Sequence, residues 1–411
     1  MPTLRAAMDG LTLRGRAFLA AGATVVVCAL LLGQDDLVRI GALVLALPLL
    51  AAAYVGLRRH EVATSRSISR PVVPAGTPCE VEVTLSRSGG VRAGDLLVEE
   101  QVPYALGTRP RFLLHGLGRD RERHVTYPVR SDVRGRFEVG PLTSRLSDPF
   151  GLVEVRRTHP GTATITVTPP VLALPTIDLG TGRRGTGDHH SSLGAAGSPE
   201  DATVRDYRRG DDLRRVHWRS SARTGELMVR REEQPWEARA TLLLDNRAVA
   251  HLGRGLASSL ETAVVLAASI AVHLDAHGYA VRLVTADGPA SRGTEPVAAV
   301  LERLAVVGTS SRTTLDAVAA GDAARGLVAG VLGSAGDDDR AALRRIRQDA
   351  GTALALALDV EQWRPRGEVT TGLGAAVGPL LASGWRATAV GRHHRPAQAW
   401  RELGARRAVT R

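Results

Sequence analysis

The chain has 411 residues, enough for two or three domains at about 100–200 residues each. With 44% hydrophobic and 23% charged residues, its composition is that of a folded protein and excludes global disorder. All 53 basic residues are arginine, and the net charge of +11 favours acidic partners, either anionic lipid headgroups or nucleic acid, without choosing between them. Cys28 and Cys79 stand in unrelated contexts, which excludes a disulfide framework and a zinc site built on cysteines.

Two apolar stretches within residues 1–60 predict a membrane hairpin. They cover about 17–33 and 37–57, and a crossing helix needs roughly 17–25 residues. Arg39 lies near the start of the second stretch, where its side chain can reach the headgroups. A cleaved signal peptide is the competing interpretation, but the second stretch follows after only Gln-Asp-Asp, with no convincing cleavage site before it.

The charges around these stretches predict their orientation. Arginines flank the hairpin on its outer ends, at Arg5, Arg14, Arg16, Arg58, Arg59, Arg66 and Arg70. The loop between the spans holds only Asp35 and Asp36. By the positive-inside rule we expect both termini in the cytoplasm of a bacterial cell and the protein in the cell membrane, with the remainder of the chain facing the cytosol.

Residues 61–175 predict a small all-β domain. About seven short alternating runs, mostly separated by Gly, Pro and Asp, are typical of a β-sandwich of immunoglobulin-like type. They lie at 79–89, 95–103, 111–117, 123–130, 135–142, 152–158 and 162–168. Within it, Ser-Asp-Pro-Phe-Gly-Leu at 147–152 predicts a tight turn between two strands, with Phe150 available as a packing anchor. No catalytic cluster is visible in this part of the sequence.

Residues 239–411 alternate strand-like and helix-like runs, among them a helix-like run at 258–278 and a strand-like run at 279–285. This alternation predicts an α/β domain with a mainly parallel sheet covered by helices on both faces. Ligands of such folds bind at the carboxyl ends of the strands, so the loop after Asp245 is the first candidate site. Neither glycine-rich phosphate-binding fingerprint is present, and we therefore expect no bound nucleotide, no other cofactor and no ATP hydrolysis by this chain.

Residues 176–238 hold a Gly-rich loop followed by an arginine-rich block at 205–233. Helical spacing predicts a short helix from Asp212 to Thr224, capped by Gly225 and followed by a strand. Asp211 and His217 are six residues apart and do not share a helix face, which argues against a metal or catalytic site. Acids interleave with the arginines, so internal ion pairs are favoured over a nucleic-acid surface. We expect a polar network that locks the β domain against the α/β domain.

Two motifs carry a family resemblance. "RGRFEVGPLTSRLSDPFGL" followed by "RDYRRGDDLRRVHWRSSARTGELMVRREE", behind a membrane hairpin, resembles the domain of unknown function 58 family. The positions that match its signature are Arg205, Tyr207, Gly210, Asp211, Asp212, Arg214, His217, Trp218, Ser221, Ala222, Arg223, Leu227, Arg230 and Glu232. The resemblance implies an interaction or structural role for this block.

The resemblance also implies a C-terminal domain similar to von Willebrand factor A-type domains, and work alongside MoxR-type AAA ATPases and transglutaminase-like membrane proteins. A metal-binding A domain carries Asp-x-Ser-x-Ser after its first strand, whose oxygens hold Mg²⁺. Here Asp245, Asn246 and Arg247 are followed by Ala248 and Val249, so both serines are missing and Arg247 brings a positive charge to the cation's place. We expect a degenerate loop without metal.

Three hypotheses follow for the function. The leading one is a membrane-anchored, non-enzymatic scaffold or adaptor whose A-like domain binds a protein partner, in particular the ATPase. The alternative is a metal-dependent hydrolase or nuclease that uses Asp211, Asp212 and His217. A third is a cytosolic surface that binds DNA or lipid.

Overall fold

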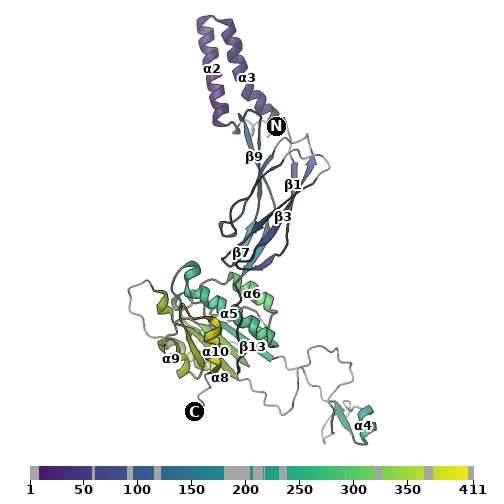
Figure 1. Cartoon of the computed structure of the whole chain (residues 1–411), viewed down its shortest axis with the longest axis vertical. Helices are drawn as coiled ribbons and strands as arrows, with labels where there is room; N and C mark the ends of the chain where they lie inside the picture. The colour runs from purple at the N-terminus through teal and green to yellow at the C-terminus, as the bar shows by residue number, and fades with distance from the viewer. Residues whose placement is uncertain are drawn as a thin grey trace. The chain divides into compact units, whose positions relative to one another are not determined.

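A computed structural model describes most of the chain (Figure 1). The described residues are 9–57, 61–89, 96–114, 122–179, 204–206, 216, 218–230, 238–291, 293–319, 326–364 and 374–405. By their internal contacts the residues form two compact units, 1–171 with 301–308 and 172–300 with 309–411. Each unit has its own fold.

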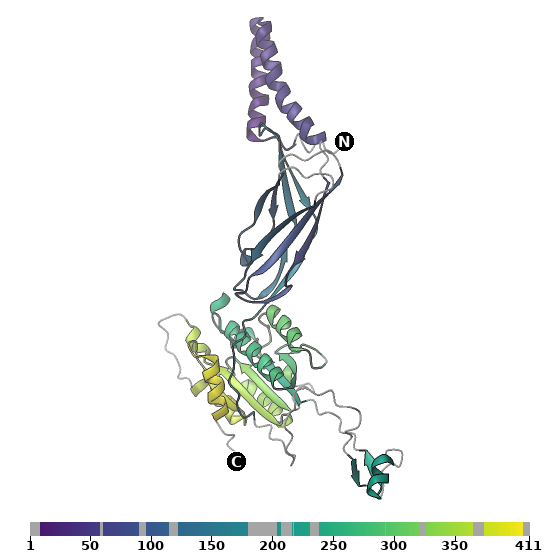
Figure 2. The same cartoon turned by 45° about the vertical axis from the view of Figure 1, so that its right-hand side comes forward.

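The first unit begins with a pair of apolar helices, α2 (Leu13–Leu32) and α3 (Asp35–Leu57), drawn in purple (Figures 1 and 2). Thr12 caps α2 by accepting a hydrogen bond from the Gly15 amide at 3.2 Å, and Gly33 ends the helix in the left-handed region. The Thr12 cap explains why α2 begins slightly before the apolar run in the sequence. Both are long and apolar enough to cross a membrane, which confirms that part of the expected hairpin.

Small residues allow the two helices to approach closely. A Cβ on Gly22 would lie 2.8 Å from the side chain of Leu45, and one on Gly41 would lie 2.6 Å from that of Val26. Close backbone approach at small residues is typical of helix pairs in lipid, where packing rather than water exclusion drives association. The close approach at Gly22 and Gly41 therefore suits two helices that pack against each other as a hairpin in lipid.

Ten strands among the described residues form a β-sandwich-like body in the first unit, more than the sequence indicated. The sheets have the orders β1-β3-β6, β5-β4-β8-β9 and β2-β10-β7. The strands are β1 (Glu61–Ile68), β2 (Val72–Pro74), β3 (Cys79–Gly89), β4 (Leu96–Glu100), β5 (Arg111–Leu114), β6 (Arg123–Val129), β7 (Gly135–Val139), β8 (Leu142–Ser147), β9 (Glu154–His159) and β10 (Ala163–Thr168), with a 3-10 turn η1 (Tyr104–Leu106). Alternate residues such as Val81, Val83 and Leu85 face a shared core, as period-two patterning requires.

The predicted tight turn is present between β8 and β9, but the role expected for Phe150 is wrong. The Asp148 carboxylate accepts hydrogen bonds from the amides of Phe150 at 2.8 Å and Val153 at 2.6 Å. This ring of bonds turns the Phe150 side chain outward, where it is 63% exposed. Leu152 and Val153, which follow the turn, make the apolar contacts instead.

The second unit contains a six-stranded sheet of order β15-β14-β13-β16-β17-β18. The strands are β13 (Ala238–Leu244), β14 (Tyr279–Thr285), β15 (Gly288–Pro289), β16 (Leu327–Leu332), β17 (Thr352–Leu358) and β18 (Arg386–Val390). All neighbours are parallel except the short edge strand β15. Leu244 pairs with Thr285 and with Val331, so the carboxyl ends of β13, β14 and β16 meet at one edge.

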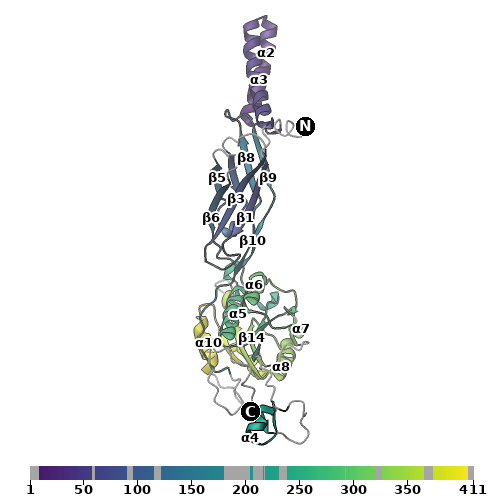
Figure 3. The same ribbon diagram turned by 90° about the vertical axis from the view of Figure 1, so that its right-hand side faces the viewer.

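Helices lie on both faces of this sheet, as the alternation in the sequence predicts (Figure 3). They are α5 (Ser259–Ala276), α7 (Asp316–Ala319), α8 (Arg340–Asp349), α9 (Gly374–Ala382) and α10 (Pro396–Ala405), with 3-10 turns η3 (Ala248–Ala250), η4 (Gly255–Ala257), η6 (Asp337–Asp339) and η7 (Val360–Trp363). α6 (Val297–Val306) begins in the second unit, and its residues from 301 onward belong to the first. α8 and α9 contribute Leu343, Ile346 and Leu380 to one core. α5 also has the length and hydropathy of a membrane span, but it packs on β13, β14 and β16 and is largely buried there.

Candidate functional site

The loop that follows β13 begins at the carboxyl edge of the parallel sheet with three buried polar residues. Asp245, Asn246 and Arg247 are all less than 5% exposed. Buried charges are costly unless they are paired and hydrogen-bonded, so the contacts of these side chains define the site.

Arg247 lies between two carboxylates that are far apart in the sequence. Its Nε and Nη2 donate to the two oxygens of Asp245 at 2.9 and 2.8 Å, as a bidentate pair. Its Nη1 donates to Asp339 at 2.7 Å and to the Thr313 carbonyl at 2.8 Å. The second oxygen of Asp339 accepts from the Gly336 amide at 3.1 Å. The guanidinium therefore fills the space between the two acids.

The electrostatics keep this arginine charged. Burial by itself disfavours the charged form, but hydrogen bonds to Asp245 and Asp339 and their negative charges outweigh it and raise the pKa of Arg247 above its ordinary value. Two carboxylates against one guanidinium leave the cluster with one net negative charge. A divalent cation could reach the same carboxylates only by displacing the guanidinium. Among the described residues, no group of three or more His, Cys, Asp or Glu side chains is arranged to hold a metal ion.

A second set of bonds holds the rest of the loop. The His251 imidazole lies between the Asp245 carbonyl, 2.6 Å from Nε2, and the Ser259 hydroxyl, 2.9 Å from Nδ1. A neutral ring that donates from Nε2 and accepts at Nδ1 satisfies both contacts. Burial lowers the pKa of His251, and the charge of Arg247 acts in the same direction. The ring is therefore neutral near neutral pH.

The loop is also tied to the neighbouring strands. Asn246 accepts from the Ala286 amide at 3.0 Å, which connects the ends of β13 and β14. The Ser310 amide donates to the Asn246 carbonyl at 2.7 Å, and the Ser310 hydroxyl donates to Asp287. Gly333, which follows β16, approaches the Ala250 carbonyl so closely that a Cβ there would lie 2.1 Å away. The loop is thus preorganised by contacts on several sides.

Two large apolar side chains stand exposed on this rigid loop. Val249 is in η3 and Leu256 is in η4, and both are more than half exposed. Val249 occupies the second serine position of the metal-binding pattern. The edge thus combines a fixed backbone with two apolar side chains that face solvent.

The arginine-rich block is described only in part. β11 (Val204–Asp206) pairs antiparallel with β12 (Met228–Arg230), and α4 (Trp218–Thr224) lies between them in sequence. Gly225 ends α4 with φ +78°, the predicted left-handed cap. The predicted helix from Asp212 to Thr224 is wrong at Val216, which lies in an isolated β-bridge outside α4. A β-branched residue favours such extended backbone.

Five of the signature side chains belong to the described residues. Trp218, Ala222, Arg223 and Leu227 are exposed, and the Ser221 hydroxyl accepts from the Met228 amide at 2.8 Å, tying α4 to β12. Arg205 is in β11 and Arg230 is in β12, and nothing is described of either side chain. The remaining predicted positions lie outside the described residues, namely Tyr207, Gly210, Asp211, Asp212, Arg214, His217 and Glu232. Both the expected lock between domains and the alternative hydrolase site therefore stay predictions.

Sequence reasoning did not find the side chains that hold the loop at 245–247. It missed Asp339, which binds Arg247, and His251 with Ser259, which bind each other and the Asp245 carbonyl. A signal was available for Asp339, since an acidic run at 337–339 follows a strand-like run and precedes a helix. Polar residues just beyond the carboxyl end of a parallel strand meet those of neighbouring strands.

A comparison with protein families finds a match to part of the chain. Residues 203–364 match the family described as "Protein of unknown function DUF58". This match covers the arginine-rich block and much of the parallel sheet, and it supports the resemblance stated above. The comparison with curated proteins finds no match.

Similar solved structures resemble only part of the chain. The CARDB domain of the PF1109 protein from Pyrococcus furiosus is 17% identical over 26% of this chain and 93% of its own, with a TM-score of 0.21. The alkylpurine DNA glycosylase AlkC of Pseudomonas fluorescens is 15% identical over 33% of this chain and 39% of its own, with a TM-score of 0.19. Scores this low carry no argument about function.

Proposed function

We propose that this chain is a membrane-anchored, non-enzymatic scaffold whose C-terminal α/β unit binds a protein partner at the carboxyl edge of its sheet. The partner is a MoxR-type AAA ATPase, and a transglutaminase-like membrane protein belongs to the same assembly. α2 and α3 cross the cell membrane with both termini in the cytoplasm. The unit is A-like, and a strand order in which the first strand is central and a short antiparallel strand lies at one edge supports this assignment.

One observation carries the proposal, namely the buried guanidinium of Arg247 between Asp245 and Asp339. An A-like domain that binds its partner through a metal presents the ion at this edge. Here an internal cation neutralises part of the acidic charge and fixes the loop, while Val249 and Leu256 face outward. Partner binding then depends on shape and apolar contact, and it needs no divalent ion at this edge.

Co-purification of the ATPase with tagged full-length protein from detergent-solubilised membranes tests the proposal. The double variant Val249→Asp with Leu256→Asp should lose the ATPase, because a charge in the centre of an apolar contact opposes its desolvation. Leu381→Asp is the matched control, since Leu381 is an exposed apolar residue on α9 of the same unit. Repeated recovery of no ATPase by the parent protein, or equal recovery by the double variant, would refute the proposal.

A further inference from the structure

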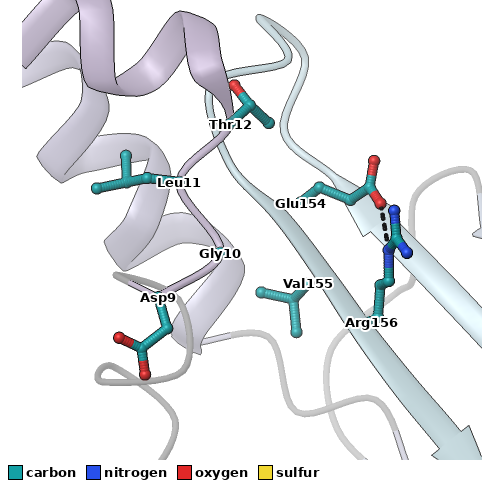
Figure 4. Close-up of a pocket in the computed structure, with 7 residues that line it drawn as sticks. All are labelled: Asp9, Gly10, Leu11, Thr12, Glu154, Val155 and Arg156. Carbon is teal, nitrogen blue, oxygen red and sulfur yellow. Dashed lines mark hydrogen bonds and ion pairs between the residues drawn. The ribbon is translucent and has the colours of Figure 1, made fainter.

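The segment before α2 and the turn after β8 are joined by a dense set of contacts within the first unit. The Thr12 hydroxyl donates to the Gly151 carbonyl at 2.7 Å, and its amide donates to the Leu152 carbonyl at 2.9 Å. The Glu154 amide donates to the Gly10 carbonyl at 2.9 Å. Figure 4 shows residues 9–12 running beside β9, with a shallow hollow between them lined by 154–156.

Packing reinforces these bonds. Leu152 and Val153 form a buried apolar cluster with Ala51, Ala52 and Val55 at the end of α3. Gly15 leaves room for the Leu152 carbonyl, which a Cβ would meet at 2.2 Å. The β-sandwich-like body is therefore attached, through residues 151–154, to the start of α2 and the end of α3, which we call the hairpin base. The start of β9 lies beside the hairpin base in Figures 1 and 3.

These contacts determine where the exposed side chains of the turn after β8 lie along the length of the hairpin. Residues 151–152 are bonded to Thr12, which caps the first turn of α2, so Phe150 stands at the level where the apolar span begins. Leu13 is also exposed in that turn, and the side chains of Arg14 and Arg16 are exposed beside it. An Arg14 guanidinium nitrogen lies 3.9 Å from the place of a Cβ on Gly151.

We propose that Phe150 and Leu13 insert into the lipid headgroup layer, with Arg14 and Arg16 bound to lipid phosphates. The inference rests on the proposed membrane anchoring, and it adds a peripheral lipid contact made by the β-sandwich-like body itself. Phe and Leu side chains of proteins bound at the membrane surface bury at the boundary between headgroups and hydrocarbon, and arginines there reach the phosphates. The occupant is lipid because the patch continues the surface of two apolar helices at the end where their spans begin.

This contact gives the turn a function beyond linking two strands. A body attached by a flexible tether would sample many orientations. A lipid contact, added to the contacts at the hairpin base, holds the β-sandwich-like body at a fixed depth and tilt relative to the membrane. The motif Ser-Asp-Pro-Phe-Gly-Leu then has a separate task for each part. Asp148 shapes the turn, Leu152 holds the helices and Phe150 enters the lipid.

Depth-dependent fluorescence quenching tests the proposal on the full chain in mixed phosphatidylcholine and phosphatidylglycerol vesicles. Phe150→Cys is labelled with a polarity-sensitive fluorophore in a Cys28→Ala background, where the buried Cys79 stays unlabelled. Tyr104→Cys is the matched control. Tyr104 is 97% exposed in the same body, and the pairing of Glu100 with Leu142 places it at the opposite end of β8 from the turn. Leu13→Cys gives an independent second probe.

We expect nitroxide lipids to quench the labels at 150 and 13 several-fold more than the label at 104, and aqueous iodide to show the reverse order. Iodide access at 150 equal to that at 104 would overturn the inference. So would shielding of position 150 from both quenchers, which would indicate a protein partner. A label on native Cys28, exposed on α2, separates the two proposals. If nitroxide lipids quench the Cys28 label but not the label at 150, the membrane anchor stands and the inference about Phe150 fails. If aqueous iodide quenches the labels at both 28 and 150, the membrane anchor and the inference both fail.

Discussion

Replacing Arg247 with methionine removes the cation but retains much of the apolar volume of the side chain. Arg247 is 1% exposed, and its four hydrogen bonds end on Asp245, Asp339 and the Thr313 carbonyl. The variant leaves two carboxylates buried without their cation. Removing one partner of a buried ion pair costs about 3–5 kcal/mol, a large share of a typical unfolding free energy of about 5–15 kcal/mol.

All five tryptophans belong to the second unit, so thermal unfolding followed by intrinsic fluorescence reports on it selectively. For a unit of this size, the expected loss corresponds to a fall in Tm of about 6–20 °C. Arg340→Met is the matched control, because Arg340 pairs with Asp337 at the same 2.8 Å distance but is 48% exposed. Exposed pairs contribute about 0–1 kcal/mol, so this control should hardly change Tm.

A double variant tests whether the loss comes from the orphaned charges. Adding Asp339→Asn to Arg247→Met removes one of the two uncompensated carboxylates, and it should restore part of the lost stability. Equal Tm values for Arg247→Met and Arg340→Met would refute the reasoning. The reasoning would also be refuted if the double variant lost more stability than the two single variants lose together.

Three other outcomes are expected. Arg247→Ser should gain a Tm increase with Mn²⁺ that the parent lacks, because the ion replaces the lost cation; stabilisation reaches about 2.7 kcal/mol at one hundred times the dissociation constant, and no gain would show that the carboxylates cannot serve as ligands. The folded state holds the pKa of His251 below its ordinary 6.5, so the unfolded chain binds more protons than the folded chain as pH falls below that value. The free energy of unfolding should therefore decrease as pH falls below 6.5, and it should decrease less steeply in His251→Gln. Asp148→Ala should destabilise the first unit by about 1–3 kcal/mol in denaturant titration, against no measurable loss for the exposed Asp132→Ala.

Local patterning was informative wherever a segment has one strongly buried face. The run at 279–285 matches β14 residue for residue, and the helix expected at 258–278 appears as α5. Both depend on periodic apolar residues bounded by glycine or serine, and this signal does not require knowledge of distant contacts. Short or polar strands carry a weaker signal, so β1, β2 and β8 were not anticipated.

The turn at 147–152 shows the limit of this reasoning. Its Asp-Pro and Gly residues determine that the chain reverses, because they favour tight turns through local hydrogen bonding and backbone freedom. They do not say which apolar side chain will be covered. That choice depends on the helices bonded to the turn, and it left Phe150 exposed while Leu152 packed against α3.

By itself, the sequence determined the apolar hairpin, the strand-rich middle and the alternating C-terminal half, since each follows from the local periodicity of apolar residues. Through the resemblance to A-type domains, it also led us to expect arginine where a metal-binding loop has serine. Only the tertiary structure decided that this arginine lies between Asp245 and Asp339, which are 94 positions apart in the chain. The physical reason is that neighbouring parallel strands bring the loops at their carboxyl ends to one edge, and no local pattern records which loops will meet there.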